Sequence, residues 1–177
     1  MDKNYNVVGY VKLAKLWERS ENSAIEYHHN YYQNKFANYS NYNLHDVYID
    51  ITGKKETYKR MEMVRLLKDC QFGYVDIIFT QTKGYLAANN REFCYLIKFL
   101  FSMTHRIDII TEDDSYNINT LVNDDNQREA LLKMADDCIY LNPLDFQEWM
   151  NELVRIINRL GNDLGVRYGK RNKDGHN

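Results

Sequence analysis

Val75-Asp76-Ile77-Ile78-Phe79 decides the fold, because it is the strongest β-strand pattern in the chain. Its apolar residues fall on both faces, which is typical of an interior strand in a parallel sheet. Apolar residues recur with helical spacing before and after it, at residues 58–70 and 91–103, and Gly73 predicts the end of the first helix. Residues 80–90 are expected to form a loop. This order predicts an α/β fold.

The alternation of strands and helices continues in both directions from this segment. We predict further strands at residues 7–13, 47–50 and 106–111, and further helices at residues 23–38, 124–137 and 145–160. Thr57 is expected to cap the helix at residues 58–70. The apolar stripe of that helix would consist of Met61, Val64, Leu66 and Leu67.

Length and composition predict one folded domain with a tail. The chain has 177 residues, of which 44% are hydrophobic, and its formal net charge is −2 at pH 7. This charge argues against a surface that binds nucleic acid throughout, so a DNA contact would be confined to a local patch. The first residues lack the apolar core of a signal peptide, and no apolar run reaches the roughly 18 residues that span a membrane. We therefore expect a cytoplasmic protein with no membrane partner.

Seven short segments follow one another between residues 9 and 120. They are GYVKLA at 9–14, ENS at 21–23, VYIDITG at 47–53, KRMEMVRLLKD at 59–69, GYVDII at 73–78, YLAAN at 85–89 and NINT at 117–120. Their order and spacing resemble the N-terminal catalytic domain of serine recombinases, the resolvase and invertase family, and most of all the large transposon recombinases. The resemblance implies a resolvase-like three-layer sandwich, with a mostly parallel sheet of four to five strands flanked by helices, plus a C-terminal helix.

The resemblance also implies where catalytic residues would stand. In that family a serine at the end of the first strand attacks a DNA phosphate, and several arginines stabilise charge on the phosphorus oxygens. In this sequence Ala14 stands at the serine position. The arginine just before it is replaced by Lys12, which keeps a charge but cannot make a bidentate contact. The nucleophile is therefore absent.

The other active-site positions differ as well. Gly84 replaces an acid, Tyr85 and Ala88 replace two arginines, and Tyr27 replaces a glutamine. Only Arg60 matches a catalytic arginine, and it is expected either to contact phosphate or to be a solvated helix residue. We considered Tyr85 as a substitute nucleophile, but without surrounding arginines a packing role is favoured. We therefore predict no enzymatic activity and no catalytic residue.

The C-terminal part predicts an interaction surface. We expect a resolvase-like domain at residues 1–141, an amphipathic helix at 142–163 and a basic flexible tail at 164–177. The apolar face of the helix predicts dimerisation, with docking onto its own domain as the alternative; it consists of Phe146, Trp149, Leu153, Ile156, Ile157 and Leu160. Candidates for DNA contact are Arg60, Arg167, Lys170, Arg171 and Lys173.

Other kinds of site find little support in the sequence. The histidines lack the spacing of a metal site. The acidic groups at residues 112–114 and 124–125 could suggest magnesium, but such groups are usually solvated loops and helix N-termini. The lone Gly84 is far from a phosphate-binding loop, so we expect no metal and no cofactor. The three cysteines form no CxxC pair and suit reduced thiols. The many tyrosines between residues 27 and 48 could stack on single-stranded nucleic acid, but their spacing favours packing.

The function that these features predict is that of a catalytically inactive, serine-recombinase-like regulatory or accessory module, associated with a mobile element or DNA recombination. Its partner would be a second copy of itself or a recombinase. The alternative is a DNA-binding regulator that uses the basic tail. A third hypothesis, an active strand-transfer enzyme with relocated chemistry, has no supporting set of residues.

Overall fold

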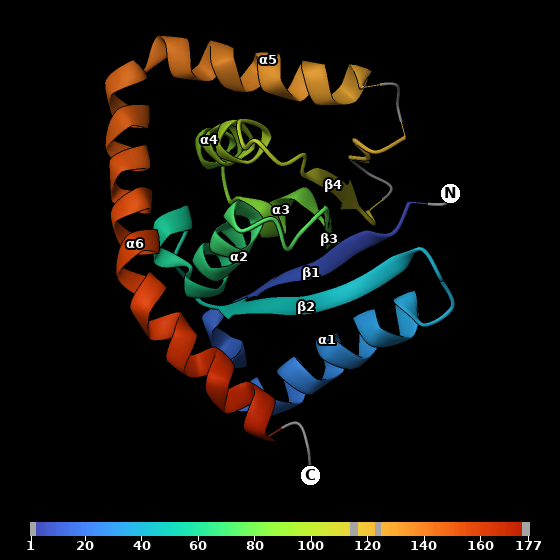
Figure 1. Cartoon of the computed structure of the whole chain (residues 1–177). Coiled ribbons are helices and arrows are strands. Elements are labelled where there is room, and N and C mark those ends of the chain that lie inside the picture. Colours follow the sequence, from blue (N-terminus) through green and yellow to red (C-terminus); the bar gives the residue numbers. More distant parts are fainter. Residues whose placement is uncertain (1–2, 114–116, 123–124, 175–177) are drawn as a thin grey trace.

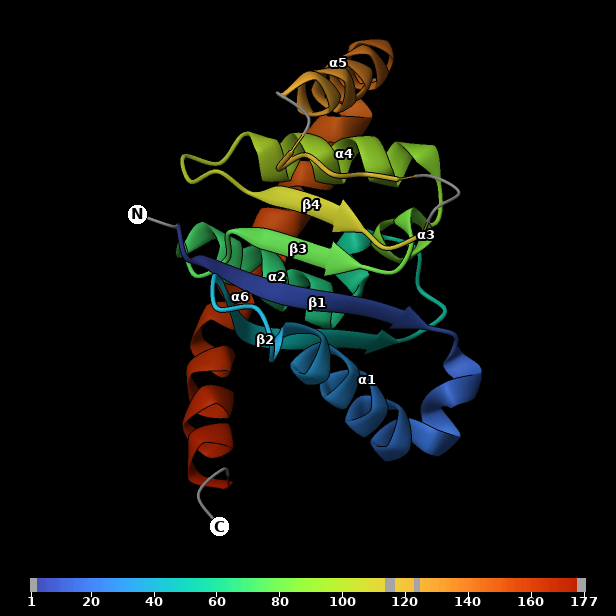
Figure 2. The same ribbon diagram turned by 90° about the vertical axis from the view of Figure 1, so that its right-hand side faces the viewer.

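The structure is a four-stranded parallel sheet with helices on both faces (Figure 1). The computed structural model describes residues 3–113, 117–122 and 125–174, with side chains as far as residue 160. The strands are β1 (Tyr5–Leu13), β2 (Tyr42–Ile51), β3 (Ile77–Thr80) and β4 (Asp108–Thr111). Their order is β2-β1-β3-β4, and Figure 2 shows all four side by side and pointing the same way. The α/β fold and the interior strand predicted near residue 77 are confirmed.

The helices form layers around this sheet. On one face lies α1 (Glu21–Phe36), and on the other lie α2 (Met61–Gln71) and α4 (Asn90–Phe101). Outside them, α5 (Asn126–Leu141) packs on α4, and α6 (Pro143–Asp174) runs along α2 (Figure 1). The expected three-layer arrangement is thus present, with two further helices outside one face.

An aromatic cluster joins α1 to the sheet. The ring of Phe36 lies 4.8 Å from that of Phe79 on β3 and 5.8 Å from that of Tyr42 on β2, centroid to centroid. Tyr32, fully buried, stacks on Phe36 at 6.3 Å. Rings at these separations contribute beyond the area that they bury. Packing thus describes Tyr32 and Tyr42, whereas Tyr27 and Tyr39 are 64% and 54% exposed.

Gly9, in the middle of β1, is required by the close approach of α1. A Cβ atom at this position would lie 2.6 Å from two ring carbons of Tyr32. A side chain here would therefore push α1 away from the sheet. Gly73 serves a different purpose, because its φ of 78° ends α2 in the left-handed region that favours glycine. The predicted end of this helix is confirmed.

The start of α2 differs from the prediction. Thr57 belongs to a short 3-10 helix, η2 (Thr57–Lys59), and does not cap α2. The capping group is Asp50, at the end of β2. Its carboxylate oxygens each accept a 2.9 Å hydrogen bond, one from the backbone N–H of Glu62 and the other from that of Met63. This carboxylate satisfies free N–H groups and meets the positive end of the helix dipole.

Several further details were not predicted. A 3-10 helix, η1 (Lys15–Ser20), follows β1, and a single helical turn, α3 (Lys83–Leu86), lies within the expected loop at residues 80–90. On α2, Met61 is 46% exposed and Met63 is fully buried, so Met63 takes the place predicted for Met61 in the apolar stripe. Met61 is the first residue of α2, where the helix enters from the 3-10 turn η2.

The last helix, α6, is longer than predicted. It begins at Pro143, a residue well suited to the first helical turn, and has 32 residues. The helix thus continues through residues 164–174, where the sequence predicts a flexible tail. Extending an existing helix avoids the unfavourable nucleation step, so it requires less apolar content than folding alone.

Candidate functional site

The carboxyl end of β1, where the sequence places the site, offers little chemistry. Ala14 is exposed at the turn into η1, where its carbonyl accepts a 3.0 Å hydrogen bond from the N–H of Trp17. A methyl group supplies neither a nucleophile nor a proton. Lys12 is half-buried nearby. Burial, and then the positive charge of Arg60, lowers the pKa of the Lys12 ammonium.

Arg60 lies in the interior and is only 1% exposed. One terminal nitrogen, Nη1, donates to the hydroxyl of Tyr10 and to the carbonyl of Tyr85, both at 3.0 Å. The other, Nη2, donates to the carbonyl of Leu86 at 2.5 Å and to the hydroxyl of Thr57 at 3.4 Å. The sequence led us to expect a phosphate contact or a solvated side chain, and the structure shows neither. Internal acceptors engage both Nη nitrogens, Nε is buried without a hydrogen-bond partner, and at 1% exposure the guanidinium is not open to a phosphate.

Tyr10 connects this guanidinium to a carboxylate. Its hydroxyl accepts from Arg60 and donates to Oδ2 of Asp50 at 2.8 Å. Burial raises the pKa of Tyr10 well above its usual value, although the charge of Arg60 opposes this effect. The hydroxyl therefore keeps its proton and serves as a neutral bridge between a cation and an anion.

The same network reaches α6 through Glu92, which is 1% exposed. Its Oε2 accepts from the backbone N–H and the hydroxyl of Thr57, at 3.1 and 2.9 Å, and from the indole N–H of Trp149 at 2.8 Å. Because Thr57 also contacts Arg60, polar contacts run without a break from Asp50 at the end of β2 to Trp149 on α6. Sequence reasoning missed these roles, and its only local signal was an acid at the end of a strand.

The segment in place of the family's two-arginine loop forms α3 and is held by Arg60 through its backbone. Its first turn is capped by Thr82, whose hydroxyl accepts from the N–H of Gly84 at 3.2 Å. Gly84 and Ala88 are exposed. The ring of Tyr85 is partly buried and packs against the apolar clusters on the two faces of the sheet. Burial raises the pKa of Tyr85, which disfavours the nucleophilic phenolate. These contacts support the packing role favoured for Tyr85.

Tyr27 lies apart from these groups, because α1 covers the opposite face of the sheet from Arg60. It is 64% exposed, and its ring meets that of His28 edge-on at 5.0 Å. The two residues border a hollow of about 410 Å³ whose other walls are Leu13, Trp17, Ser23 and Ala24. Leu13 and Trp17 flank the turn at Ala14, so Tyr27 borders the carboxyl end of β1 from the face opposite Arg60, and the walls of this hollow are mostly apolar.

The apolar face of α6 docks onto its own domain. Leu153 is fully buried in the core, and Trp149 and Ile157 are each 4% exposed. The remaining members of the predicted interface pack at the edge of the same core; they are Phe146, Ile156 and Leu160. The structure thus shows the alternative that the sequence left open, because the apolar groups on the domain side are covered by this face.

The basic residues proposed for DNA contact lie beyond the side chains that the structure describes. These residues are Arg167, Lys170, Arg171 and Lys173, and their contact with DNA stays a prediction. Together with the interior position of Arg60, this leaves no proposed DNA contact that the described side chains support.

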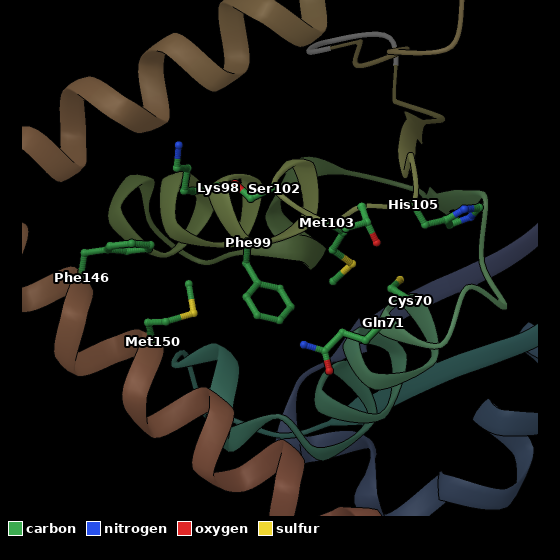
Figure 3. Close-up of a pocket in the computed structure, with 10 residues that line it drawn as sticks. Cys70, Gln71, Lys98, Phe99, Ser102, Met103, His105, Phe146 and Met150 are labelled. Carbon is green, nitrogen blue, oxygen red and sulfur yellow. The ribbon is translucent and has the colours of Figure 1, made fainter.

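A hollow of about 530 Å³ lies between α2, α4 and α6 (Figure 3). In the close-up, Phe99, Met103 and Met150 point into one space. At its rim, His105 contacts Asp76 at 2.9 Å and Lys98 pairs with Asp136 at 2.8 Å. The other lining residues are Cys70, Gln71, Ser102, Thr104 and Phe146. The walls suit an apolar group, and the side chains of Lys98 and His105 at the rim are engaged by carboxylates.

The described ranges contain neither a cluster of metal ligands nor a membrane-spanning helix. Among these residues, no three His, Cys, Asp or Glu side chains gather closely enough to hold a metal ion. No helix within the described ranges has both the length and the hydropathy to cross a membrane.

Comparison with known proteins identifies the fold. No family model matches the sequence, and no curated protein matches it. The crystal structure of the N-terminal catalytic domain of TP901-1 integrase, a serine recombinase, is similar, with a TM-score of 0.54 and 18% identity. The similarity covers 78% of this chain and 96% of that one. At this identity it shows a shared fold and not a shared chemistry. The chain therefore has an α/β fold like that of a serine recombinase catalytic domain.

Proposed function

We propose that this chain is a catalytically inactive protein with a serine-recombinase-like fold that works by binding other proteins. It would be a regulatory or accessory module in DNA recombination or on a mobile element. The observation that carries the proposal is the interior position of Arg60, with all four of its Nη hydrogen bonds made to groups of the chain itself. The one residue that matches a catalytic arginine is thus used to hold the fold together.

The remaining positions support the same conclusion. Transfer of a DNA phosphate to a protein hydroxyl needs a nucleophile and cations that stabilise the charged transition state. Ala14 supplies no nucleophile, and Lys12 offers a single amine beside the buried network. Each missing donor lowers such a rate by on the order of 10²- to 10³-fold. Restoring one residue would therefore leave the reaction far below a detectable rate.

An exposed apolar corner is the best surface for a partner. Tyr140, Leu141 and Leu144 are 84%, 76% and 79% exposed, and they flank the bend between α5 and α6 (Figure 1). Adjacent apolar side chains left open to water are typical of protein interfaces. Since α6 uses its apolar face internally, this corner is where we place contact with a second copy or with a recombinase.

Loss of catalysis is tested by the variant Ala14→Ser. It is incubated with supercoiled DNA, and the mixture is resolved on a denaturing gel next to an active serine recombinase on its own site. We expect an adduct for the active enzyme and none for the variant, because the guanidinium of Arg60 stays inside. A covalent link between protein and DNA in this single variant would overturn the proposal.

Association is tested separately, by light scattering and by pull-down of a purified recombinase. The expected result is a mass above the 21.2 kDa of one chain, or capture of the recombinase. Either should be lost in the double variant Leu141→Ser, Leu144→Ser. The matched control is Leu16→Ser, on η1, which is 76% exposed at a different place. A strictly monomeric protein that captures no recombinase would refute the binding function.

A further inference from the structure

Two of the three cysteines meet where α4 packs against α5. Cys94 on α4 is fully buried, and its sulfur lies 4.0 Å from the carbonyl oxygen of Met134 on α5. Met134 and Cys138 are one helical turn apart on the same face of α5. Cys94 and Cys138 both belong to the apolar cluster at this helix contact, and Cys138 is partly exposed. A buried thiol thus lies close to one that solvent can reach.

We propose that Cys94 and Cys138 form a reversible oxidation site, at which a peroxide converts the two thiols into a disulfide between α4 and α5. Disulfide formation needs Cβ atoms about 3.5–4.5 Å apart, a separation that a small shift of the packed helices α4 and α5 would set, and rotation about χ1 then brings the two sulfur atoms together. The inference rests on these two helices and is independent of the proposed binding function.

The reaction begins at the more accessible sulfur. The thiolate of Cys138 attacks one peroxide oxygen, the O–O bond breaks, and a sulfenic acid and hydroxide form. The sulfur of Cys94 then attacks the sulfur of Cys138, an S–S bond forms, and the second oxygen leaves as water. Two thiols and one hydrogen peroxide thus give one disulfide and two waters. Each sulfur loses one electron, and the two peroxide oxygens are reduced.

The surroundings fix this order of events. Burial, and next the neighbouring Cys138, raises the pKa of the Cys94 thiol to about 11, so Cys94 is a poor first nucleophile at neutral pH. Its position directly beside Cys138 makes it the resolving group. Cys70 on α2 is fully buried, and burial raises its pKa as well, which makes it the matched control.

The cross-link would stiffen the outer helices. It would join α4 in the core to α5, which leads directly into α6 at Pro143. By restricting the unfolded chain, a disulfide that closes a loop of this size is expected to raise the midpoint of thermal unfolding by about 5–10 °C.

The test treats the full-length protein with a small excess of hydrogen peroxide. Free thiols should fall from three to one, the intact mass should fall by about 2 Da, and a reductant should reverse both changes. In Cys70→Ala the thiols should fall from two to none. In Cys138→Ser and in Cys94→Ala no intramolecular disulfide should form, and the thermal midpoint should not rise on oxidation.

Three results would overturn the inference. One is survival of all thiols in the wild-type protein under conditions that oxidise glutathione. Another is a gain of about 32 Da at Cys138, which would mean oxidation to a sulfinic acid without capture by Cys94. The last is a disulfide between two chains in place of one within a chain, seen as a dimer on a non-reducing gel.

Discussion

Nη1 of Arg60 lies 3.0 Å from the hydroxyl oxygen of Tyr10, and the same guanidinium reaches the carbonyl oxygens of two residues on α3. One side chain therefore braces β1 against α3 inside the protein. The planar fork of arginine matches this task, because it presents several donors in fixed directions. Asp50, on the far side of the Tyr10 hydroxyl, supplies the compensating charge.

Removing this cation should destabilise the fold. Arg60→Met leaves the carbonyls of Tyr85 and Leu86 without these donors, and Asp50 without the cation that the Tyr10 hydroxyl connects to it. We expect a loss of about 3 kcal/mol in the free energy of unfolding, measured by urea denaturation, since breaking a buried ionic network typically costs this much. Arg60→Lys should lose less, because it keeps the charge, but an ammonium cannot satisfy both carbonyls in the same geometry.

The matched control is Arg19→Met, at an exposed position of η1. It should change the free energy of unfolding by no more than about 0.5 kcal/mol. Equal stability of Arg60→Met and Arg19→Met would mean that the network does not hold the fold. Arg60 would then be free to serve another purpose, including contact with phosphate.

The indole of Trp149 is the last donor of the same network. Trp149→Phe keeps most of the packing but removes the 2.8 Å hydrogen bond to Glu92. We expect a loss of about 1–3 kcal/mol, the range for a buried hydrogen bond to a charged group. Trp17→Phe, at a side chain that is 50% exposed, should have little effect in the same urea experiment. A Trp149→Phe protein as stable as the wild type would show that this contact does not fasten α6.

Local patterns predicted much of the fold. The apolar run around Ile77 identified an interior strand, and Gly73 identified a helix end, because both depend on neighbouring residues alone. The start of α2 was predicted wrongly for the opposite reason. Its cap is Asp50, a residue of another element, and Thr57 uses its backbone N–H and hydroxyl on Glu92, which lies 35 positions away.

The candidate site shows more clearly that local sequence patterns do not predict contacts between distant elements. The resemblance in residues 9–14 places it at the end of β1, with Ala14 where the family has a serine. The burial of Arg60 could not be read from the sequence, since its acceptors come from β1, η2 and α3, which only the folded chain brings together. Likewise, the apolar stripe of α6 predicted a buried face, but sequence periodicity does not say whether the covering surface belongs to the same chain.

The contact between Gly9 and Tyr32 gives a test of how tightly α1 packs. In Gly9→Ala the new methyl group would meet the Tyr32 ring at 2.6 Å, and we expect a loss of about 1–3 kcal/mol from overpacking. Gly53→Ala is the matched control, because a Cβ atom there meets nothing within 4 Å. In a Tyr32→Ala background the cost of Gly9→Ala should largely disappear, a coupling that a double-mutant cycle measures in urea. If Gly9→Ala lowered the free energy of unfolding equally in the wild type and in Tyr32→Ala, the strain would not come from the Tyr32 ring.

Alkaline pH should weaken the fold through its tyrosines. Burial, together with a hydrogen bond to Glu112, raises the pKa of Tyr31 to about 12, from an ordinary value of 10.0. The folded chain therefore holds this proton more tightly than the unfolded chain. The stability that Tyr31 contributes is complete below about pH 10 and is lost as the pH rises through about 12. Burial shifts the pKa of Tyr10 and Tyr85 in the same direction.

The measurement is urea unfolding at several values between about pH 9 and pH 11.5, with tyrosine ionisation followed by absorbance. The free energy of unfolding should fall with rising pH in the wild type, and fall less steeply in Tyr31→Phe, which has lost one of the groups that titrate differently in the two states. Tyr74→Phe is the matched control, because that side chain is 50% exposed and lies outside the surface proposed for a partner. If Tyr31→Phe and Tyr74→Phe showed the same slope as the wild type, the contact between Tyr31 and Glu112 would not be formed in solution, and α1 would be held to the end of β4 by other groups.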